Sequence, residues 1–225
     1  MDDLNTEIYS ASDIQNYCMQ IDKNKKDPIL YFNRGKLYQN NKNYELALFD
    51  YNTAINLKED FFEAYRDRGS VYLELQEYEN AIADFNVAIN LNRTEELLYY
   101  NRGIANVCLD LHKLAIQDFT TALKINPQRL ETLLYRGFSY KKTLNYENAK
   151  RDYMQAIKID NNNHAAYLSL ANLYVEINSL EKAIENYEIA KKLNPLLDVD
   201  KKIKTCKKYL QNWKGKKYGY FNFSR

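Results

Sequence analysis

Small and aromatic residues return along this chain at a fixed interval of 34 residues. Glycine marks four intervals, at Gly35, Gly69, Gly103 and Gly137, and Ala171 marks the fifth. Two rows of alanine and one row of aromatic residues share the interval: Ala47, Ala81, Ala115, Ala149 and Ala183; Ala54, Ala88, Ala122, Ala156 and Ala190; and Tyr51, Phe85, Phe119, Tyr153 and Tyr187. Members of neighbouring rows lie three, four or seven residues apart, so they share one face of a helix. Polar breaks such as residues 40–43 separate two such faces, which predicts two short amphipathic helices per interval.

The interval divides most of the chain into five repeats, residues 28–61, 62–95, 96–129, 130–163 and 164–197. One pair of short helices cannot bury both of its apolar faces, so neighbouring pairs have to stack into a continuous core. The predicted fold is therefore all-α, a solenoid of tandem helix-turn-helix repeats. Much of the tyrosine content, 21 residues, is explained by this repetition.

The repeat resembles the tetratricopeptide repeat (TPR) family over residues 28–197. The resemblance rests on glycine at the eighth position, alanine at the twentieth and twenty-seventh, and an aromatic residue at the twenty-fourth. It departs from the family at the fourth position, where tyrosines such as Tyr31 stand in place of the frequent tryptophan. The resemblance implies a right-handed superhelix whose first helices line a concave groove for a peptide or protein segment.

The two ends of the chain depart from the repeat. Residues 1–27 are interpreted as an N-terminal half-repeat with a capping helix over 11–23, and a disordered leader is the alternative. Residues 198–213 place Val199, Ile203 and Cys206 on one side and lysines on the other, which resembles the solvating helix that ends TPR arrays. In the basic-aromatic tail, 214–225, two glycines argue against a helix. The tail could fold back on the array, stay loose or dock into another molecule.

Arginine and aspartate recur together in the first four repeats and are lost together in the fifth. The pairs are Arg34 with Asp50, Arg68 with Asp84, Arg102 with Asp118 and Arg136 with Asp152, and Leu170 and Asn186 replace them. An arginine on a helix-packing face needs a partner, so each is predicted to bind the aspartate of its own repeat. Arginines that reach water, or a row that binds phosphate, are the alternatives.

The TPR resemblance places ligand-facing side chains on the first helix of each repeat. The candidate residues of the peptide-binding groove are Phe32, Asn33, Lys36, Arg66, Asp67, Tyr100, Asn101, Ile104, Leu134, Tyr135, Phe138 and Lys141. The groove is predicted to be most apolar in repeats three and four, and an exposed apolar surface normally marks a binding site. The alternative for any one of these residues is packing against the next repeat.

Some TPR relatives bind the C-terminal carboxylate of chaperones through a set of lysines, arginines and asparagines. Only Arg66 and Asn101 match that set here, and Glu131 would repel a carboxylate. We therefore do not expect a chaperone C-terminus as the partner.

Composition narrows the remaining function classes. The net charge of +2 does not by itself imply nucleic acid or a membrane. Cys18, Cys108 and Cys206 form no metal or disulfide framework and suggest a reducing, cytoplasmic location. His112 occupies a packing position, and His164 begins repeat five, where exposure is expected.

Catalytic fingerprints and metal-ligand spacings are lacking, so neither an enzyme nor a cofactor is expected. The sequence predicts a protein-binding adaptor or scaffold. The alternatives are a structural module that forms homodimers through its tail or end repeat, and weak RNA binding through the basic C-terminus.

Overall fold

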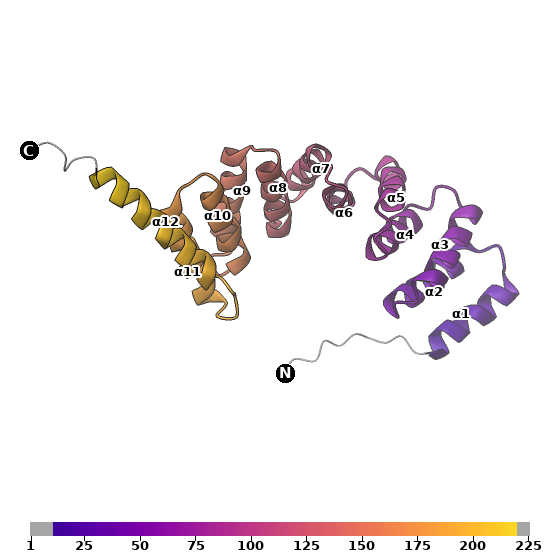
Figure 1. Ribbon diagram of the computed structural model, residues 1–225. Coiled ribbons are helices and arrows are strands. Elements are labelled where there is room, and N and C mark those ends of the chain that lie inside the picture. The colour runs from indigo at the N-terminus through magenta and orange to yellow at the C-terminus, as the bar shows by residue number, and fades with distance from the viewer. Residues whose placement is uncertain (1–10, 220–225) are drawn as a thin grey trace, which may run out of the picture. The chain divides into compact units, whose positions relative to one another are not determined.

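The computed structural model describes residues 11–219, with side chains described up to residue 212. The described residues form helices α1 to α12 and contain no strand (Figure 1). The helices are α1 (Ala11–Lys23), α2 (Pro28–Asn40), α3 (Tyr44–Leu57), α4 (Phe62–Glu74), α5 (Tyr78–Leu91), α6 (Glu96–Cys108), α7 (His112–Ile125), α8 (Leu130–Lys142), α9 (Tyr146–Ile159), α10 (His164–Glu176), α11 (Leu180–Leu193) and α12 (Asp200–Gly219). The all-α prediction is confirmed.

The chain divides into two compact units, one ending at Leu111 and the other beginning at His112. Within each unit, consecutive helices pack side by side, as α2 with α3, α4 with α5, α8 with α9 and α10 with α11. The first helices of successive repeats also touch, α2 with α4, α4 with α6 and α8 with α10. We call the surface that these first helices share in each unit the first-helix face.

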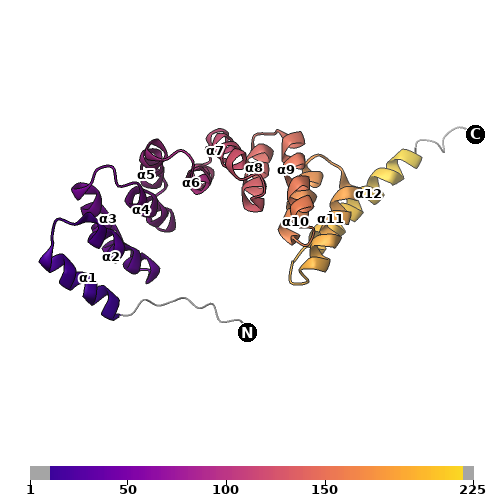
Figure 2. The same ribbon diagram turned by 180° about the vertical axis from the view of Figure 1, so that it is seen from behind.

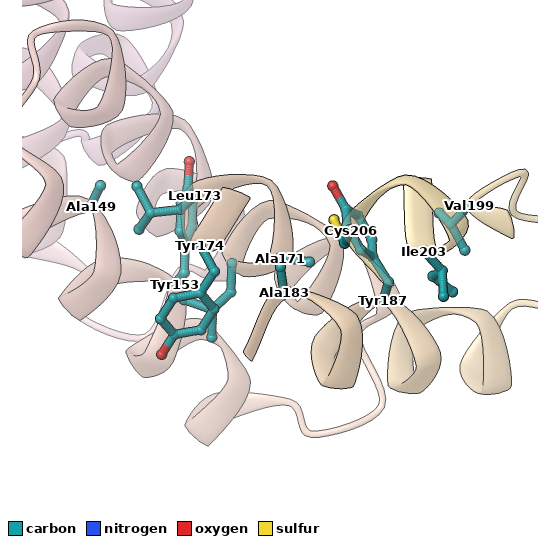
Figure 3. Close-up of a cluster of buried hydrophobic side chains, with 11 residues drawn as sticks. Ala149, Tyr153, Ala171, Leu173, Tyr174, Ala183, Tyr187, Val199, Ile203 and Cys206 are labelled. Atoms are coloured by element: carbon teal, nitrogen blue, oxygen red, sulfur yellow. The ribbon is translucent and has the colours of Figure 1, made fainter. Parts of the chain in front are cut away.

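Glycine at the repeat's eighth position lets the paired helices approach closely. A Cβ on Gly35 would lie 2.9 Å from Tyr51 Cε1, and one on Gly137 would lie 2.7 Å from Tyr153 Cε1. Real side chains do not tolerate such distances, so the aromatic ring occupies the space that glycine leaves. In repeat five, Ala171 and Tyr187 are both buried in a cluster that also contains residues of α12 (Figure 3).

The turn between the helices of each repeat contains one residue in the left-handed conformation. These residues recur every 34 positions, at Lys42, Gln76, Asp110, Leu144 and Asn178, with φ between 57° and 61°. The conformation costs most residues about 1 kcal/mol, and asparagine, aspartate and glycine adopt it most easily. Leu144 is therefore strained, and its side chain is 71% exposed, so little burial compensates.

The predicted arginine–aspartate pairs are confirmed in repeats one, two and four. Arg34, Arg68 and Arg136 each donate two hydrogen bonds to the carboxylate sixteen residues ahead, with N–O distances of 2.6–2.8 Å. Burial raises the pKa of Asp50 and Asp84 against the opposing effect of the arginines. The pair of Arg102 with Asp118 would join the two units and stays a prediction.

The same arginines also bind the preceding repeat, which the sequence reading missed. Arg68 Nη1 donates to Asn52 Oδ1 at 2.5 Å, Arg102 Nη1 to Asn86 Oδ1 at 2.6 Å, and Arg136 Nη1 to Thr120 Oγ1 at 3.3 Å. Each acceptor lies sixteen residues before its arginine. Arg34 also contacts a residue sixteen positions earlier, because its Nη1 lies 3.2 Å from Cys18 Sγ on α1. Helix α1 thus occupies the place of a second helix before repeat one.

Helix α12 packs on the last repeat through the residues predicted to face it. Val199, Ile203 and Cys206 are buried in the cluster of Tyr187 (Figure 3). The prediction that the helix stops at 213 was wrong, because α12 continues to Gly219. One glycine costs a helix interior only about 1 kcal/mol, and lysine, the commonest neighbour here, has a high helix propensity, so Gly215 does not end the helix. Residues 220–225 of the predicted tail lie outside the described residues.

We expect Leu144→Asn to stabilise the protein by about 1 kcal/mol, because asparagine adopts the left-handed turn conformation more easily than leucine. Urea unfolding followed by circular dichroism measures the change. Asn178→Leu, at the equivalent turn one repeat later, is the matched control and should destabilise. A lower stability of Leu144→Asn would contradict the strain.

We expect Arg68→Leu alone to cost about 3 kcal/mol, because it leaves the Asp84 carboxylate buried without its cation. Adding Asp84→Asn, which reproduces repeat five, should recover most of this loss. The loss in Arg68→Leu should also shrink as the pH falls from 7 toward 4, because the pKa of Asp84 is raised in the folded state and its protonation removes the unpaired charge. Equal and additive losses, independent of pH, would contradict the pairing.

Candidate functional site

Helix α2 contributes three of the predicted groove residues, and one of them is not available to a ligand. Phe32 is only 9% exposed, and its ring centroid lies 4.9 Å from that of Phe61 and 5.9 Å from that of Tyr51. Phe61, the last residue of repeat one, covers the Phe32 ring. The prediction of Phe32 as a groove contact was therefore wrong. Asn33 is half-buried, and the exposed Lys36 places its ammonium 5.7 Å from the Phe32 ring.

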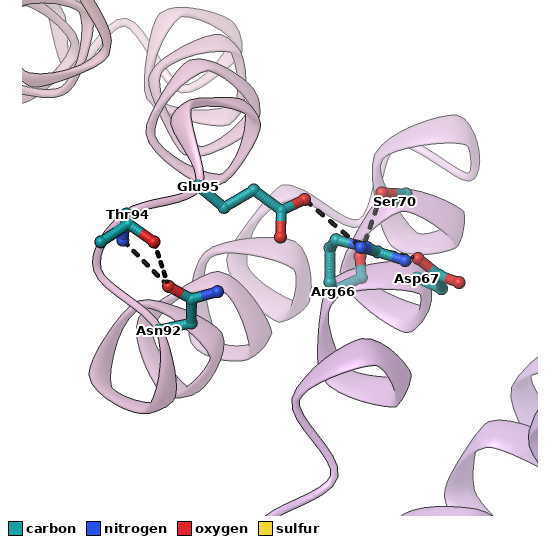
Figure 4. Close-up of polar contacts among 6 residues, drawn as sticks. All are labelled: Arg66, Asp67, Ser70, Asn92, Thr94 and Glu95. Carbon is teal, nitrogen blue, oxygen red and sulfur yellow. Dashed lines mark hydrogen bonds and ion pairs between the residues drawn. The ribbon is translucent and has the colours of Figure 1, made fainter. Parts of the chain in front are cut away.

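Helix α4 carries Arg66 and Asp67, which bind one another. Arg66 Nε donates to Asp67 Oδ1 at 2.7 Å, and Nη1 donates to Glu95 Oε1 at 3.3 Å (Figure 4). Ser70 Oγ donates to the Arg66 carbonyl at 3.0 Å. Burial lowers the pKa of Arg66, but hydrogen bonds and charges of Asp67 and Glu95 outweigh it and raise that pKa. The positive charge at this position is thus already balanced within the chain.

Helix α6 presents the last predicted residues of the N-terminal unit. Tyr100, Asn101 and Ile104 are all half-buried, and Leu97, one turn before, is 40% exposed. Tyr100, Asn101 and Ile104 lie in one unit, whereas the predicted apolar residues of repeat four lie in the other. A single apolar stretch across repeats three and four therefore stays a prediction.

Helix α8 presents an exposed aromatic side chain that is held in place. Tyr135 is 40% exposed, and its ring stacks on Phe119 of α7 at a centroid distance of 6.1 Å. Phe138 is half-buried and lies edge-on to His112 at 5.6 Å, which confirms His112 as a packing residue. Lysine ammonium groups at positions 141 and 142 lie 5.8 and 5.5 Å from the Phe138 ring. Leu134 packs against two clusters of buried hydrophobic residues, one that contains Tyr153 and one that contains Leu133.

A cavity that the sequence reading missed lies between α8, α10, α11 and α12. We call it the lysine-rimmed cavity, and its volume is about 590 Å³. Its lining residues are Lys141, Asn172, Val175, Glu176, Tyr187, Asp198, Lys201, Lys202, Thr205 and Cys206. Lys141 Nζ, one of the predicted site residues, binds Glu176 Oε1 at 2.7 Å on its rim. The signal in the sequence was the lysine-rich start of α12.

Comparison with known proteins identifies the repeat. Profiles described as "Tetratricopeptide repeat" match residues 28–61, 131–163 and 164–195, and one described as "TPR repeat" matches residues 69–107. The chain belongs to the tetratricopeptide repeat family. No curated protein matches this TPR chain in sequence.

Solved structures share the TPR fold of this chain. YrrB, described as a TPR protein with an unusual peptide-binding site, is 25% identical with a TM-score of 0.73, over 80% of this chain and 93% of that one. MamA from Desulfovibrio magneticus is 18% identical with a TM-score of 0.73, over 76% and 97%. Part of a TPR protein from Cytophaga hutchinsonii is 18% identical with a TM-score of 0.72, over 84% and 75%.

TPR proteins are typically scaffolds that bind proteins or peptides and do not catalyse reactions. Among residues 11–212, no group of three or more histidine, cysteine, aspartate or glutamate side chains could hold a metal ion. No helix of the described chain is long and apolar enough to span a bilayer. His164, expected to be exposed, is half-buried with Nε2 3.4 Å from the Asn194 amide nitrogen.

Proposed function

We propose that this TPR protein is an adaptor that binds a peptide or protein segment on its first-helix face. The observation that carries the proposal is Tyr135, a large aromatic side chain that is 40% exposed and held by stacking on Phe119. Exposed tyrosines of fixed geometry bury much area at little entropic cost, and they are frequent hot spots of interfaces.

Each unit has its own set of proposed contacts. In the C-terminal unit they are Leu134, Tyr135, Phe138 and Lys141, and in the N-terminal unit Asn33, Lys36, Arg66, Asp67, Tyr100, Asn101 and Ile104. The likeness to YrrB supports a peptide as the class of ligand. The pairing of Arg66 with Asp67 and Glu95 argues against recognition of a free carboxylate there, because these two acids already neutralise the guanidinium charge.

Self-association through the end repeat or the C-terminal tail remains the alternative function. It predicts a dimer whose mass, measured by light scattering, falls to that of one chain when residues 214–225 are deleted. The adaptor proposal predicts that this deletion leaves the binding of a selected peptide unchanged.

We expect Tyr135→Ser to weaken the binding of a peptide selected from a random library by about tenfold or more, because it removes the stacked anchor. Fluorescence anisotropy with the selected peptide measures Kd. The matched control is Phe49→Ser, which removes an aromatic side chain that is 63% exposed on α3, the second helix of its repeat. An unchanged Kd in Tyr135→Ser, or an equal loss in both variants, would overturn the proposal.

A further inference from the structure

The lysine-rimmed cavity continues into a second cavity along α12. The second cavity, about 430 Å³, is lined by Val175, Asn178, Leu180, Glu181, Tyr209 and Leu210. Val175 lines both cavities, so the two cavities adjoin at this residue, between α12 and the helices α10 and α11. Helices α10, α11 and α12 lie next to one another in both views of the chain (Figure 1 and Figure 2). We call the two joined cavities the α12 groove.

The floor of the α12 groove is apolar and uncharged. Val175 is 38% exposed at the junction, while Tyr187 and Cys206 are buried beneath the first cavity. The Tyr187 hydroxyl donates to Asn172 Oδ1 at 2.7 Å, so its hydrogen-bonding need is met. Burial raises the pKa of Tyr187 to about 12 and raises the pKa of the Cys206 thiol, so both groups are neutral at pH 7. Such a floor favours an apolar side chain of a ligand.

The rim of the first cavity carries positive charge that the chain does not neutralise. Lys202 Nζ donates to the Asn172 amide oxygen at 3.1 Å and lies 5.7 Å from the Tyr187 ring centroid, contacts that hold the ammonium without a carboxylate. Lys201 forms no ion pair within the described part of the chain. Glu176 is paired with Lys141, and Asp198, the other acid that lines this cavity, forms no ion pair with Lys201 or Lys202.

We infer that the α12 groove binds an acidic peptide segment, which places an apolar side chain on the floor and carboxylates beside Lys201 and Lys202. This inference rests on the proposed adaptor function and specifies the chemistry of one ligand. The groove runs along roughly two and a half turns of α12, from Lys201 to Leu210, or about 13 Å, which an extended peptide covers with about four residues. Acidic residues that alternate with apolar ones match this arrangement.

The groove fits a peptide better than it fits RNA. Its charges are mixed, with Glu181 and Asp198 among the lining residues, so a ligand with separated carboxylates can avoid these two acids, whereas a backbone with a phosphate at every nucleotide cannot. The second cavity offers the aliphatic side chains of Leu180 and Leu210. Tyr209, although 62% exposed, is the one aromatic ring among the described residues of that cavity, whereas single-stranded RNA is usually bound on several.

The probe is a fluorescent eight-residue peptide in which glutamates alternate with leucines, acetylated and amidated so that it carries no terminal charge. Its counterpart has glutamine in place of glutamate. We expect the full chain to bind the acidic probe with an affinity that falls as salt is raised, and to bind the glutamine counterpart more weakly by about tenfold. Both follow from the charge of the two lysines.

The decisive variant is Lys201→Gln with Lys202→Gln, which we expect to weaken binding of the acidic probe by about fivefold to tenfold, since each exposed ion pair contributes a few-fold in affinity. The matched control is Lys204→Gln with Lys208→Gln. It removes the same charge from the same helix, but those lysines line a separate cavity with Ile203 and Lys207. The control should change Kd by less than about twofold. Circular dichroism checks that both variants keep their helices.

Val175→Glu places a carboxylate where the two cavities join and should abolish binding of the acidic probe. Equal losses in the two lysine variants, or displacement of the probe by single-stranded RNA at equal charge, would overturn the inference in favour of general attraction to a basic helix. Tyr135→Ser should bind the acidic probe normally. If the chain fails to bind the probe while the selected peptide still depends on Tyr135, the inference fails and the adaptor function stands.

Discussion

The close approach of two short helices at a residue without a side chain is the contact on which this array depends. Gly35, Gly69 and Gly137 each face an aromatic ring that would collide with a Cβ. The ring fills the space between the helices, and the alanines that flank it in the sequence are fully buried. Because a helix pair of this length cannot bury its own apolar faces, each pair exists only as part of a stack. The period of 34 residues therefore follows from packing, because each helix pair must place its small and aromatic residues where the neighbouring pair needs them.

Charged side chains also contact one another at a fixed spacing of sixteen residues along the sequence. Each described arginine of the ladder reaches sixteen residues forward to an aspartate or sixteen residues back to a polar side chain, and Arg34, Arg68 and Arg136 do both. Buried ion pairs contribute little net stability, since desolvation offsets attraction, but they disfavour any register in which an arginine lacks its partners. In repeat five, Leu170 replaces the arginine and Asn186 replaces the aspartate. Met154, sixteen residues before Leu170, stands where the other repeats have a side chain that accepts from the arginine.

Features that depend on one repeat and its period could be predicted from the sequence. The helix pairs, the glycine contacts and the arginine–aspartate pairs all recur, so each copy supports the others. Features that depend on contacts from elsewhere could not. Phe32 looked like a groove residue because Phe61, which covers it, stands at the end of the repeat, outside both of its helices. The lysine-rimmed cavity forms only because α12 packs against α10 and α11. Helix α12 occurs once in the chain, so no repeated pattern in the sequence predicts how it packs.

The two offsets of the arginine ladder have a consequence for how such an array can change length. Excising one block of 34 residues between equivalent positions leaves every remaining arginine at the same distance of sixteen residues from the two repeat positions that face it. Gain or loss of a whole internal repeat therefore preserves the spacing of the arginine contacts, and the ladder can be resized without a new kind of contact. The end behaves differently, because Lys191 of repeat five binds Asp200 of α12, a contact with no counterpart in the other repeats. The internal repeats can therefore replace one another in this ladder, whereas α12 needs the lysine of repeat five.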